Sequence, residues 1–454
     1  MDSVYFDTES HDLLGHGVIL RCRTGTTDTW WQLKVPTGDA RTEIRLEPTG
    51  SHTTVPKELS TLVAGLRRGK ALRHVVTVRT DRTVHRILEA GDVLVMEIAD
   101  DEVHAVAPGR GAATLSSWRE IEAELGPAGE QDTLTMVGAR LAEAGATVST
   151  NPNRVARALG VSAAADGAAA VGRGRSAGEV IRGYLAEQDA ALISGDLGLR
   201  RGVGGMIHPT RVATRRLRST LRIFADYFDA DQARTYDAEL SWYAALLGEV
   251  RDREVQRARF TTAIAALPEE LVMGPVAARI EQSLLAEQLQ HQTALEKALN
   301  GRRYLALLRE SARWVSNPPF TDLAVGRATD LRGAVRVAAK KVTKHLAAGM
   351  GARGEDLELH KARKAGKRAR YAAELAGRAL GKKTRNAVRE YQALQDILGE
   401  HQDGVVAADL LRRLGAATVG RSDENGFTYG LLYAQELYRA EESRRKAEAW
   451  AGKR

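Results

Sequence analysis

The chain has 454 residues, a formal net charge of +8 and one cysteine, Cys22. A chain of this length is too long to fold around one ordinary hydrophobic core, so we expect two or three domains. The single cysteine excludes an internal disulfide. No apolar run approaches the roughly 20 residues of a membrane helix, and no apolar leader follows the N-terminus, so we expect a cytoplasmic protein without membrane association.

The basic excess lies entirely in the C-terminal half. The residues before Ala177 carry a net charge of −3, and those from Ala177 onward carry +11. A basic surplus in one domain favours an anionic partner, although a solvated basic surface gives the same pattern.

Short alternating segments fill the first 125 residues and predict strands separated by Gly, Asp, Thr and Pro turns. They cover residues 4–8, 18–23, 30–36, 41–48, 75–88, 93–99 and 118–125. Charged residues occupy alternate positions, as in Arg21 and Arg23, so one face of the sheet is charged. Such a face is either the solvated side of an open sheet or the polar interior of a barrel.

Helical periodicity begins near Thr133, and an Ala/Gly-rich stretch follows. We expect a strand-rich domain over 1–162, a linker over 163–178 and a helical domain over 179–452. Within the helical domain, breaks are expected at Pro268, at Pro275, at Pro318 and in the loop Gly349–Gly354. The expected class is therefore a multidomain α+β protein.

An internal repeat is the clearest pattern in the helical half. The segment His208–Phe224 returns as His360–Ala376, and the hexapeptide LGEVRD at 247–252 returns as LGEHQD at 398–403. The two pairs of segments are offset by 152 and 151 residues, and similarity at nearly the same offset predicts two homologous helical units.

Each copy places cations three and four residues apart, and this spacing puts them on one face of a helix. We call these sets the basic ridges. The ridge of the first copy comprises His208, Arg211, Arg215, Arg218 and Arg222, with Arg216 beside it; that of the second comprises His360, Arg363, Lys367 and Arg370, widened by Lys364 and Arg368. A separate apolar stripe of Leu217, Leu221, Phe224 and Phe228 predicts the buried side of the first helix.

Like charges at this spacing destabilise an isolated helix by roughly 0.2–0.5 kcal/mol per pair. Either a bound polyanion or nearby carboxylates must offset the repulsion, and Glu249, Asp252, Glu400 and Asp403 are the candidate carboxylates. Linear polyphosphate suits such a ridge through charge-assisted hydrogen bonds and counterion release. Nucleic acid is disfavoured, because aromatic residues make up only 5% of the chain and do not interleave with the ridges.

The motifs His-x-x-Arg-x-x-x-Arg-Arg-x-Arg and Leu-Gly-x-x-x-Asp resemble those of the CHAD family over roughly Ala177 to Trp450. The resemblance implies an all-α domain of two pseudo-symmetric four-helix bundles that binds inorganic polyphosphate or another polyanion without a cofactor. By this likeness His208 and His360 belong to the binding site, together with the Arg and Lys residues of the ridges.

The N-terminal strands resemble the CYTH family of triphosphate tunnel enzymes. The likeness rests on the segments Tyr5–Thr8, Leu20–Arg23, Trp31–Lys34, Arg41–Glu43, Glu97–Asp101 and Trp118–Leu125. It implies an antiparallel tunnel, and by position it assigns the phosphate contacts to Arg21, Arg23, Lys34 and Arg79 or Arg82. It assigns Mg²⁺ or Mn²⁺ to the carboxylates Glu97, Asp101, Glu120, Glu122 and Glu124.

One departure from the CYTH pattern limits the enzymatic expectation. The family's first strand, Glu-x-Glu-x-Lys, is missing before the segment that starts at Tyr5. We therefore expect an incomplete barrel, with metal-dependent triphosphatase activity only if that strand is restored by an upstream start; otherwise the domain is a degenerate binding or structural module. Polyphosphate binding is the favoured function, with granule association as a corollary, and a triphosphatase and a structural scaffold are the alternatives.

Overall fold

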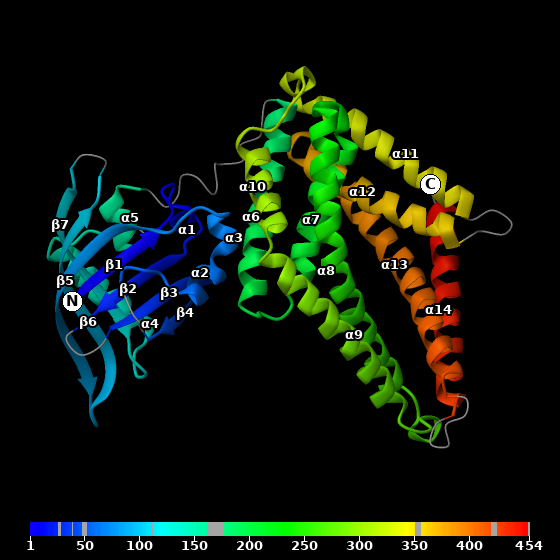
Figure 1. The fold of residues 1–454 in the computed structure, drawn as a ribbon, viewed down its shortest axis with the longest axis horizontal. Helices are drawn as coiled ribbons and strands as arrows, with labels where there is room; N and C mark the ends of the chain where they lie inside the picture. The colour runs from blue at the N-terminus through cyan, green and yellow to red at the C-terminus, as the bar shows by residue number, and fades with distance from the viewer. Residues whose placement is uncertain are drawn as a thin grey trace. The chain divides into compact units, whose positions relative to one another are not determined.

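The computed structural model describes residues 1–25, 29–38, 40–47, 52–109, 112–151, 153–161, 176–349, 356–418 and 425–452. The chain divides into two compact units, Met1–Ala170 and Val171–Arg454, which we call the N-terminal and the C-terminal unit (Figure 1). The expected linker over 163–178 lies largely outside the described residues. Among the described helices, none is long and apolar enough to cross a membrane.

A curled antiparallel sheet forms the N-terminal unit, with strand order β4-β3-β2-β1-β5-β6-β7. Its strands are β1 (Asp2–Asp7), β2 (Ile19–Thr24), β3 (Thr29–Thr37), β4 (Ala40–Leu46), β5 (Arg73–Glu89), β6 (Val93–Ala107) and β7 (Thr114–Leu125). All seven predicted strands are confirmed, and β6 runs further than its alternating pattern indicated. The described strands leave β4 and β7 at the edges, so the sheet is an open half-barrel, as the incomplete tunnel predicted.

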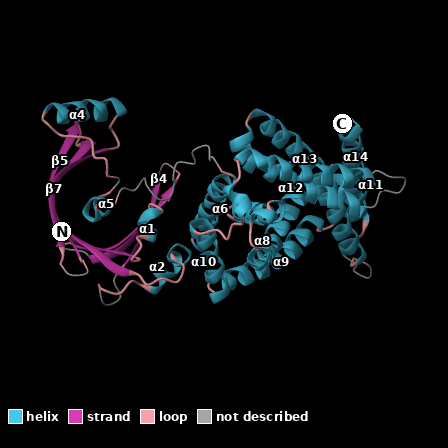
Figure 2. Ribbon diagram, turned by 90° about the horizontal axis from the view of Figure 1, so that it is seen from above, coloured by secondary structure: helices cyan, strands magenta, loops and turns pink. Residues whose placement is uncertain are grey.

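Short helices accompany this sheet. They are α1 (Asp12–Gly15), α2 (Lys57–Leu62), α3 (Ala64–Arg67), α4 (Gln131–Glu143) and α5 (Arg154–Leu159). Figure 2 shows α5 on the concave side of the sheet. There Val155, Ala156 and Ala158 join a buried cluster with Val76 and Val103, so apolar packing fixes α5 on this face.

The C-terminal unit is built from the two predicted helical copies. The first copy contains α6 (Ala177–Arg200), α7 (Ile207–Ile223), α8 (Ala230–Ala265) and α9 (Val276–Leu299), with α10 (Arg302–Ser316) added to it. The second copy contains α11 (Arg332–Gly349), α12 (Asp356–Leu380), α13 (Lys382–Ala416) and α14 (Phe427–Gly452). The predicted breaks at Pro268 and Pro275 separate α8 from α9, and Pro318 follows α10.

The predicted apolar residues Leu217, Leu221, Phe224 and Phe228 are all buried, at most 2% exposed. Helix α7 ends at Ile223, however, so Phe224 and Phe228 lie beyond the helix and not on its face. Phe228 belongs to an aromatic group in which Trp314 lies 5.1 Å from Phe228 and 5.1 Å from Tyr236, measured between ring centroids. This packing leaves the basic ridge of α7 on the side that the core does not use.

The described helices of the two copies are in contact at more than one place. Helices α6 and α7 pack against α12, α7 also contacts α11, and the tip of the α8–α9 hairpin packs against α13 and α14. The tip contact buries Phe260 and Ile280 of the first copy with Leu411 and Leu432 of the second. Next to Phe260, Arg259 of α8 forms ion pairs with Glu400 at 2.6 Å and with the buried Glu436 at 2.5 Å. Packing at separate places fixes the position of one ridge relative to the other.

We expect the fragment from Ser176 to the C-terminus to fold by itself. Its core is internal to the unit, and Ser176 with Glu179 forms a complete capping box at the start of α6. Circular dichroism should show a helical spectrum with one cooperative thermal transition. A fragment that begins after Ser176 is the control and should melt at a lower temperature, because it lacks the cap. A gradual, non-cooperative loss of ellipticity in the capped fragment would contradict the division into units.

Candidate functional site

The contact between α7 and α12 brings the two basic ridges together. Tyr371 of α12 lies under two guanidinium groups, with Arg216 of α7 5.6 Å and Arg370 4.8 Å from the ring centroid. Arg216 also pairs with Glu374 at 3.0 Å across the helix contact. Helix α7 accommodates Pro209 because this residue stands in the first turn, where no helical partner exists for its missing N–H.

Five cations converge at this contact, and we call them the basic cluster: Arg211 and Arg215 of α7 with Arg363, Lys367 and Arg370 of α12. Burial, together with the charges of Arg363, Arg215 and Arg211, lowers the pKa of Lys367 to about 7, although the charge of Asp403 opposes this shift. Burial also lowers the pKa of Arg215; Tyr371 opposes this shift, whereas Arg211, Arg370 and Arg363 add to it. Each of these cations therefore lies in the repulsive field of the others.

Arg215 and Lys367 occupy equivalent positions in the two repeats, and neither forms an ion pair with a carboxylate among the described residues. Several polar atoms beside them are also buried without a hydrogen-bond partner in the described part of the chain. They are Nε of Arg215, Nε of Arg363 and the hydroxyl of Tyr371, whereas Nε of Arg370 lies 3.3 Å from a Glu374 oxygen. Buried donors without acceptors are costly, so this arrangement is suited to receiving an anion.

The repeated hexapeptide holds two members of the cluster in place. Arg211 pairs with Asp252 of α8 at 3.0 Å, and Arg363 pairs with Asp403 of α13 at 3.4 Å. The glycine of the first motif gives its arginine room, because a Cβ at Gly248 would lie 3.3 Å from Nη2 of Arg211, whereas a Cβ at Gly399 would be in ordinary contact with Arg363 at 3.8 Å. The motif Leu-Gly-x-x-x-Asp thus positions one arginine of each ridge, and its carboxylates neutralise only part of the charge.

The repeated histidines lie at the edge of the basic cluster. Burial lowers the pKa of His208, and Arg251, Arg215 and Arg211 lower it further. Burial likewise lowers the pKa of His360, whose Nδ1 lies 2.7 Å from the Gln402 side-chain oxygen. Both imidazoles therefore titrate below their ordinary value and are neutral at pH 7.

A second group of ridge residues surrounds Asp237 of α8. Arg218 pairs with this carboxylate at 3.1 Å and Arg222 at 2.6 Å. Arg368 of α12 lies within their field, since its pKa is lowered by burial and then by Arg222 and Arg218. Lys364 is exposed, and its charge contributes to the lowered pKa of His360. All the predicted ridge residues thus lie on two helices in contact. Within the described residues, Arg215 and Lys367 are the members of the basic cluster that have no carboxylate partner.

Sequence reasoning missed three residues that border the cluster. Tyr371 and Glu374 follow the second ridge on α12, and Arg251 is the fifth residue of the first hexapeptide. The repeat contained a signal for Arg251, because it aligns with Gln402, and each of the two lies beside the histidine of its own copy. Nothing in the local pattern distinguished Tyr371 or Glu374 from neighbouring helical residues.

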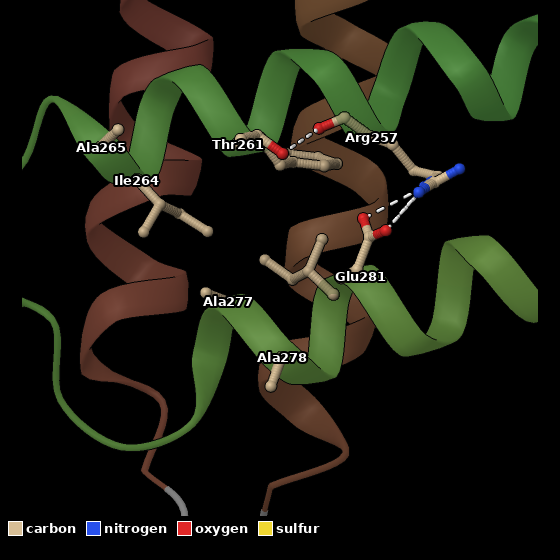
Figure 3. Close-up of a pocket in the computed structure, with 9 residues that line it drawn as sticks. Arg257, Thr261, Ile264, Ala265, Ala277, Ala278 and Glu281 are labelled. Carbon is tan, nitrogen blue, oxygen red and sulfur yellow. Dashed lines mark hydrogen bonds and ion pairs between the residues drawn. The ribbon is translucent and has the colours of Figure 1, made fainter.

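A separate hollow of about 430 Å³ lies between α8 and α9 (Figure 3). Its lining is mainly apolar and includes Ile264, Ala265, Ala277 and Ala278, and the Arg257–Glu281 ion pair closes one end. None of the basic ridge residues lines it. A charged chain would lose its hydration there without gaining cationic partners, so the hollow does not fit a polyanion.

Each unit matches the sequence model of a known domain family. The CHAD domain model matches residues 183–412, and the CYTH domain model matches residues 1–141. This chain belongs to the CHAD domain family and carries a CYTH domain before its CHAD domain.

Two curated proteins of Mycobacterium tuberculosis resemble almost the whole chain. They are the uncharacterized protein MT2285 of strain CDC 1551 and the uncharacterized protein Rv2226 of strain H37Rv, each 34% identical over 477 residues that span 99% of this chain and 88% of theirs. Their similarity extends over both domains.

Among solved structures, PptA from Streptomyces chartreusis matches with a TM-score of 0.51 and 22% identity, over 62% of this chain and 100% of that chain. The CHAD domain from the plant Ricinus communis matches with a TM-score of 0.48 and 24% identity, over 62% of this chain and 93% of that chain. The likeness to PptA supports the fold of the CHAD domain.

The CYTH domain places most of its predicted site residues on the concave face that carries α5. Strand register aligns Tyr5 with Arg21, and it aligns Arg82 with Asp101 and Asp101 with Glu120. Arg23 belongs to this face as well: burial lowers its pKa, and the charges of Arg21, Arg82 and Arg154 lower it further.

Four further predicted residues of the CYTH domain are engaged in ion pairs. On the concave face, Lys34 pairs with Glu43 at 2.7 Å and Glu97 with Arg86 at 3.1 Å. Glu122 pairs with Arg82 at 3.1 Å. Glu124 is not one of the four, and it stands opposite Glu97 in the sheet register. Arg79 differs, because it points to the opposite face and pairs with Asp2 at 3.0 Å. Of the two alternatives Arg79 and Arg82, the structure therefore brings Arg82 to the other candidates.

Proposed function

We propose that the CHAD domain binds inorganic polyphosphate along the basic ridges of α7 and α12. The observation that carries this proposal is the basic cluster, in which Arg215 and Lys367 are largely buried beside other cations and lack a carboxylate partner among the described residues. A fold that gathers such charges gains free energy when an anion with many oxygen atoms enters.

The length of the ridges favours a linear polyanion over a single phosphate. From His208 to Arg222 the helix rises roughly 21 Å at 1.5 Å per residue. A single phosphate group would meet only the basic cluster, whereas a chain of phosphates also reaches the arginines around Asp237. Arginine forks suit the phosphate oxygens, because each guanidinium offers several N–H donors in one plane.

The residues of the CYTH domain do not support a second function of this kind. Triphosphate hydrolysis would require a divalent cation on the carboxylates of β6 and β7. Asp101, Glu120 and Glu122 are instead bonded to arginine side chains.

We expect charge reversal in either ridge to weaken polyphosphate binding by at least tenfold. The variants are Arg215→Glu with Arg218→Glu, and Lys367→Glu with Arg370→Glu, each titrated with long-chain polyphosphate at two salt concentrations. Wild-type affinity should fall steeply with salt, because several phosphates release counterions on binding, and the variants should show a shallower dependence. Tripolyphosphate and single-stranded DNA serve as competitors and should bind more weakly.

The matched control is Arg234→Glu with Arg445→Glu. These two arginines are exposed at 73% and 69% of their side-chain surface and lie outside the ridges, while the change in net charge is the same. The control should bind polyphosphate about as tightly as the wild type. Equal losses in the control and ridge variants would show attraction by overall charge alone and would refute the proposed site.

A further inference from the structure

The acidic side of the CYTH domain is already occupied by arginine. Asp101 is fully buried, and its two oxygens accept hydrogen bonds from Arg82 Nε at 2.8 Å and Arg82 Nη2 at 2.7 Å, with a further bond from Arg154 Nη2. Glu120 accepts from Arg154 Nε on one oxygen and from Trp118 Nε1, at 2.7 Å, on the other. Glu122 lies 3.3 Å from Arg154 and 3.1 Å from Arg82. Every oxygen of the three carboxylates therefore faces an N–H donor.

Arg154 is held in place from both sides. It is the first residue of α5, whose start is capped by the Asn153 side chain accepting from Ala156 N at 2.8 Å. The next residues, Val155 and Ala156, are buried in the cluster that fixes α5 on the sheet. Arg157, one turn later, stacks 4.8 Å from the Trp118 ring. The guanidinium of Arg154 is thus a rigid part of the concave face.

This arrangement does not fit a divalent metal ion. Mg²⁺ and Mn²⁺ need oxygen lone pairs, and here those lone pairs are directed at guanidinium groups. The three carboxylates and two guanidiniums leave a single negative charge, too little to offset the dehydration of a divalent ion next to two fixed cations. Within the described residues, no group of three His, Cys, Asp or Glu side chains is placed to hold a metal.

We propose that Arg154 is a fixed internal cation that takes the position of a divalent metal among Asp101, Glu120 and Glu122 and excludes metal from the CYTH domain. Arg154 is then a residue that determines cation specificity. This inference does not depend on polyphosphate binding by the CHAD domain, since it concerns a different face in a different unit.

The test is a titration of the metal-free full-length chain with Mn²⁺, followed by electron paramagnetic resonance of the free ion. The variant Arg154→Met keeps the length and the apolar contacts of the side chain and removes its charge and donors. It should bind Mn²⁺ with a dissociation constant at least tenfold lower than that of the wild type, and Mn²⁺ should raise its melting temperature. Adding Asp101→Asn to Arg154→Met should abolish both effects, because the gained site uses that carboxylate.

Two controls separate loss of charge from loss of this contact. Arg154→Lys keeps a cation among the carboxylates and should bind Mn²⁺ no better than the wild type. Arg119→Met removes an arginine that pairs with Asp100 at 2.6 Å on the opposite face, and it should also leave Mn²⁺ binding unchanged.

Mn²⁺ binding to the wild-type chain tests the proposal even if Arg154→Met does not fold. If the wild type itself binds one Mn²⁺ tightly and Asp101→Asn removes that binding, Arg154 does not exclude the metal and the proposal fails. Equal Mn²⁺ affinity in wild type and Arg154→Met also overturns it. Weak wild-type binding that Asp101→Asn leaves unchanged supports it.

Discussion

Replacing Arg215 and Lys367 together with glutamine is expected to weaken polyphosphate binding at least tenfold without lowering the melting temperature. Both side chains are largely buried among other cations and have no ion pair within the described residues, so their charges repel their neighbours in the free protein. Glutamine removes this repulsion and keeps hydrogen-bonding atoms. Isothermal titration with long-chain polyphosphate and a thermal melt of the free protein measure the two effects.

A matched pair of substitutions should have a different signature. Arg211→Gln with Arg363→Gln also removes two cations of the cluster, but these arginines pair with Asp252 and Asp403. Binding should weaken and the free energy of unfolding should fall by up to about 1 kcal/mol for each partly exposed pair. If Arg215→Gln with Lys367→Gln instead lowers the melting temperature and leaves affinity unchanged, the cluster serves the fold and the binding proposal is wrong.

Polyphosphate affinity is expected to fall as the pH rises above about 7, by up to about tenfold per pH unit. In the free protein the pKa of Lys367 is lowered to about 7 by burial and by the charges of Arg363, Arg215 and Arg211. A bound polyanion favours the charged amine and raises that pKa, so binding takes up a proton above pH 7. In the free protein, burial lowers the pKa values of the two ridge histidines below the ordinary 6.5, away from the value of Lys367. Titrations at pH 7, 8 and 9 at constant ionic strength measure the slope.

The first repeat supplies the control for this pH dependence. Lys367→Arg puts at this position the residue that Arg215 provides in the other copy, and arginine stays charged across the range. The variant should bind with nearly constant affinity from pH 7 to 9 and more tightly than the wild type at pH 9. An equal slope in both proteins would show that Lys367 does not titrate on binding.

The same pKa gives the free protein an opposite pH dependence. Because the folded value of Lys367 lies below its ordinary value of 10.5, the unfolded chain holds more protons between about pH 7 and 10.5. The contribution of Lys367 to stability therefore increases as pH rises through this window. Polyphosphate should remove that trend, since the bound chain keeps Lys367 charged in the folded state.

Local pattern was enough to predict much of this molecule. Alternation identified the strands of the curled sheet, and the burial of Leu217 and Leu221 on one face of α7 follows from helical spacing. The repeat predicted two related helical copies, and the ridges could be listed residue by residue. These features depend on residues a few positions apart or on similarity between segments, and both can be read from the sequence.

The sequence by itself determined which residues are cationic, which helical face they share and that the pattern occurs twice. Only the tertiary structure decided which of these charges are neutralised. Asp252, Asp403 and Asp237 reach some arginines and leave Arg215 and Lys367 without a carboxylate among the described residues, and Arg154 reaches the carboxylates predicted to bind metal. Such pairings join residues many positions apart, and a shift of a few ångströms in helix packing makes or breaks them, so periodicity alone does not specify them.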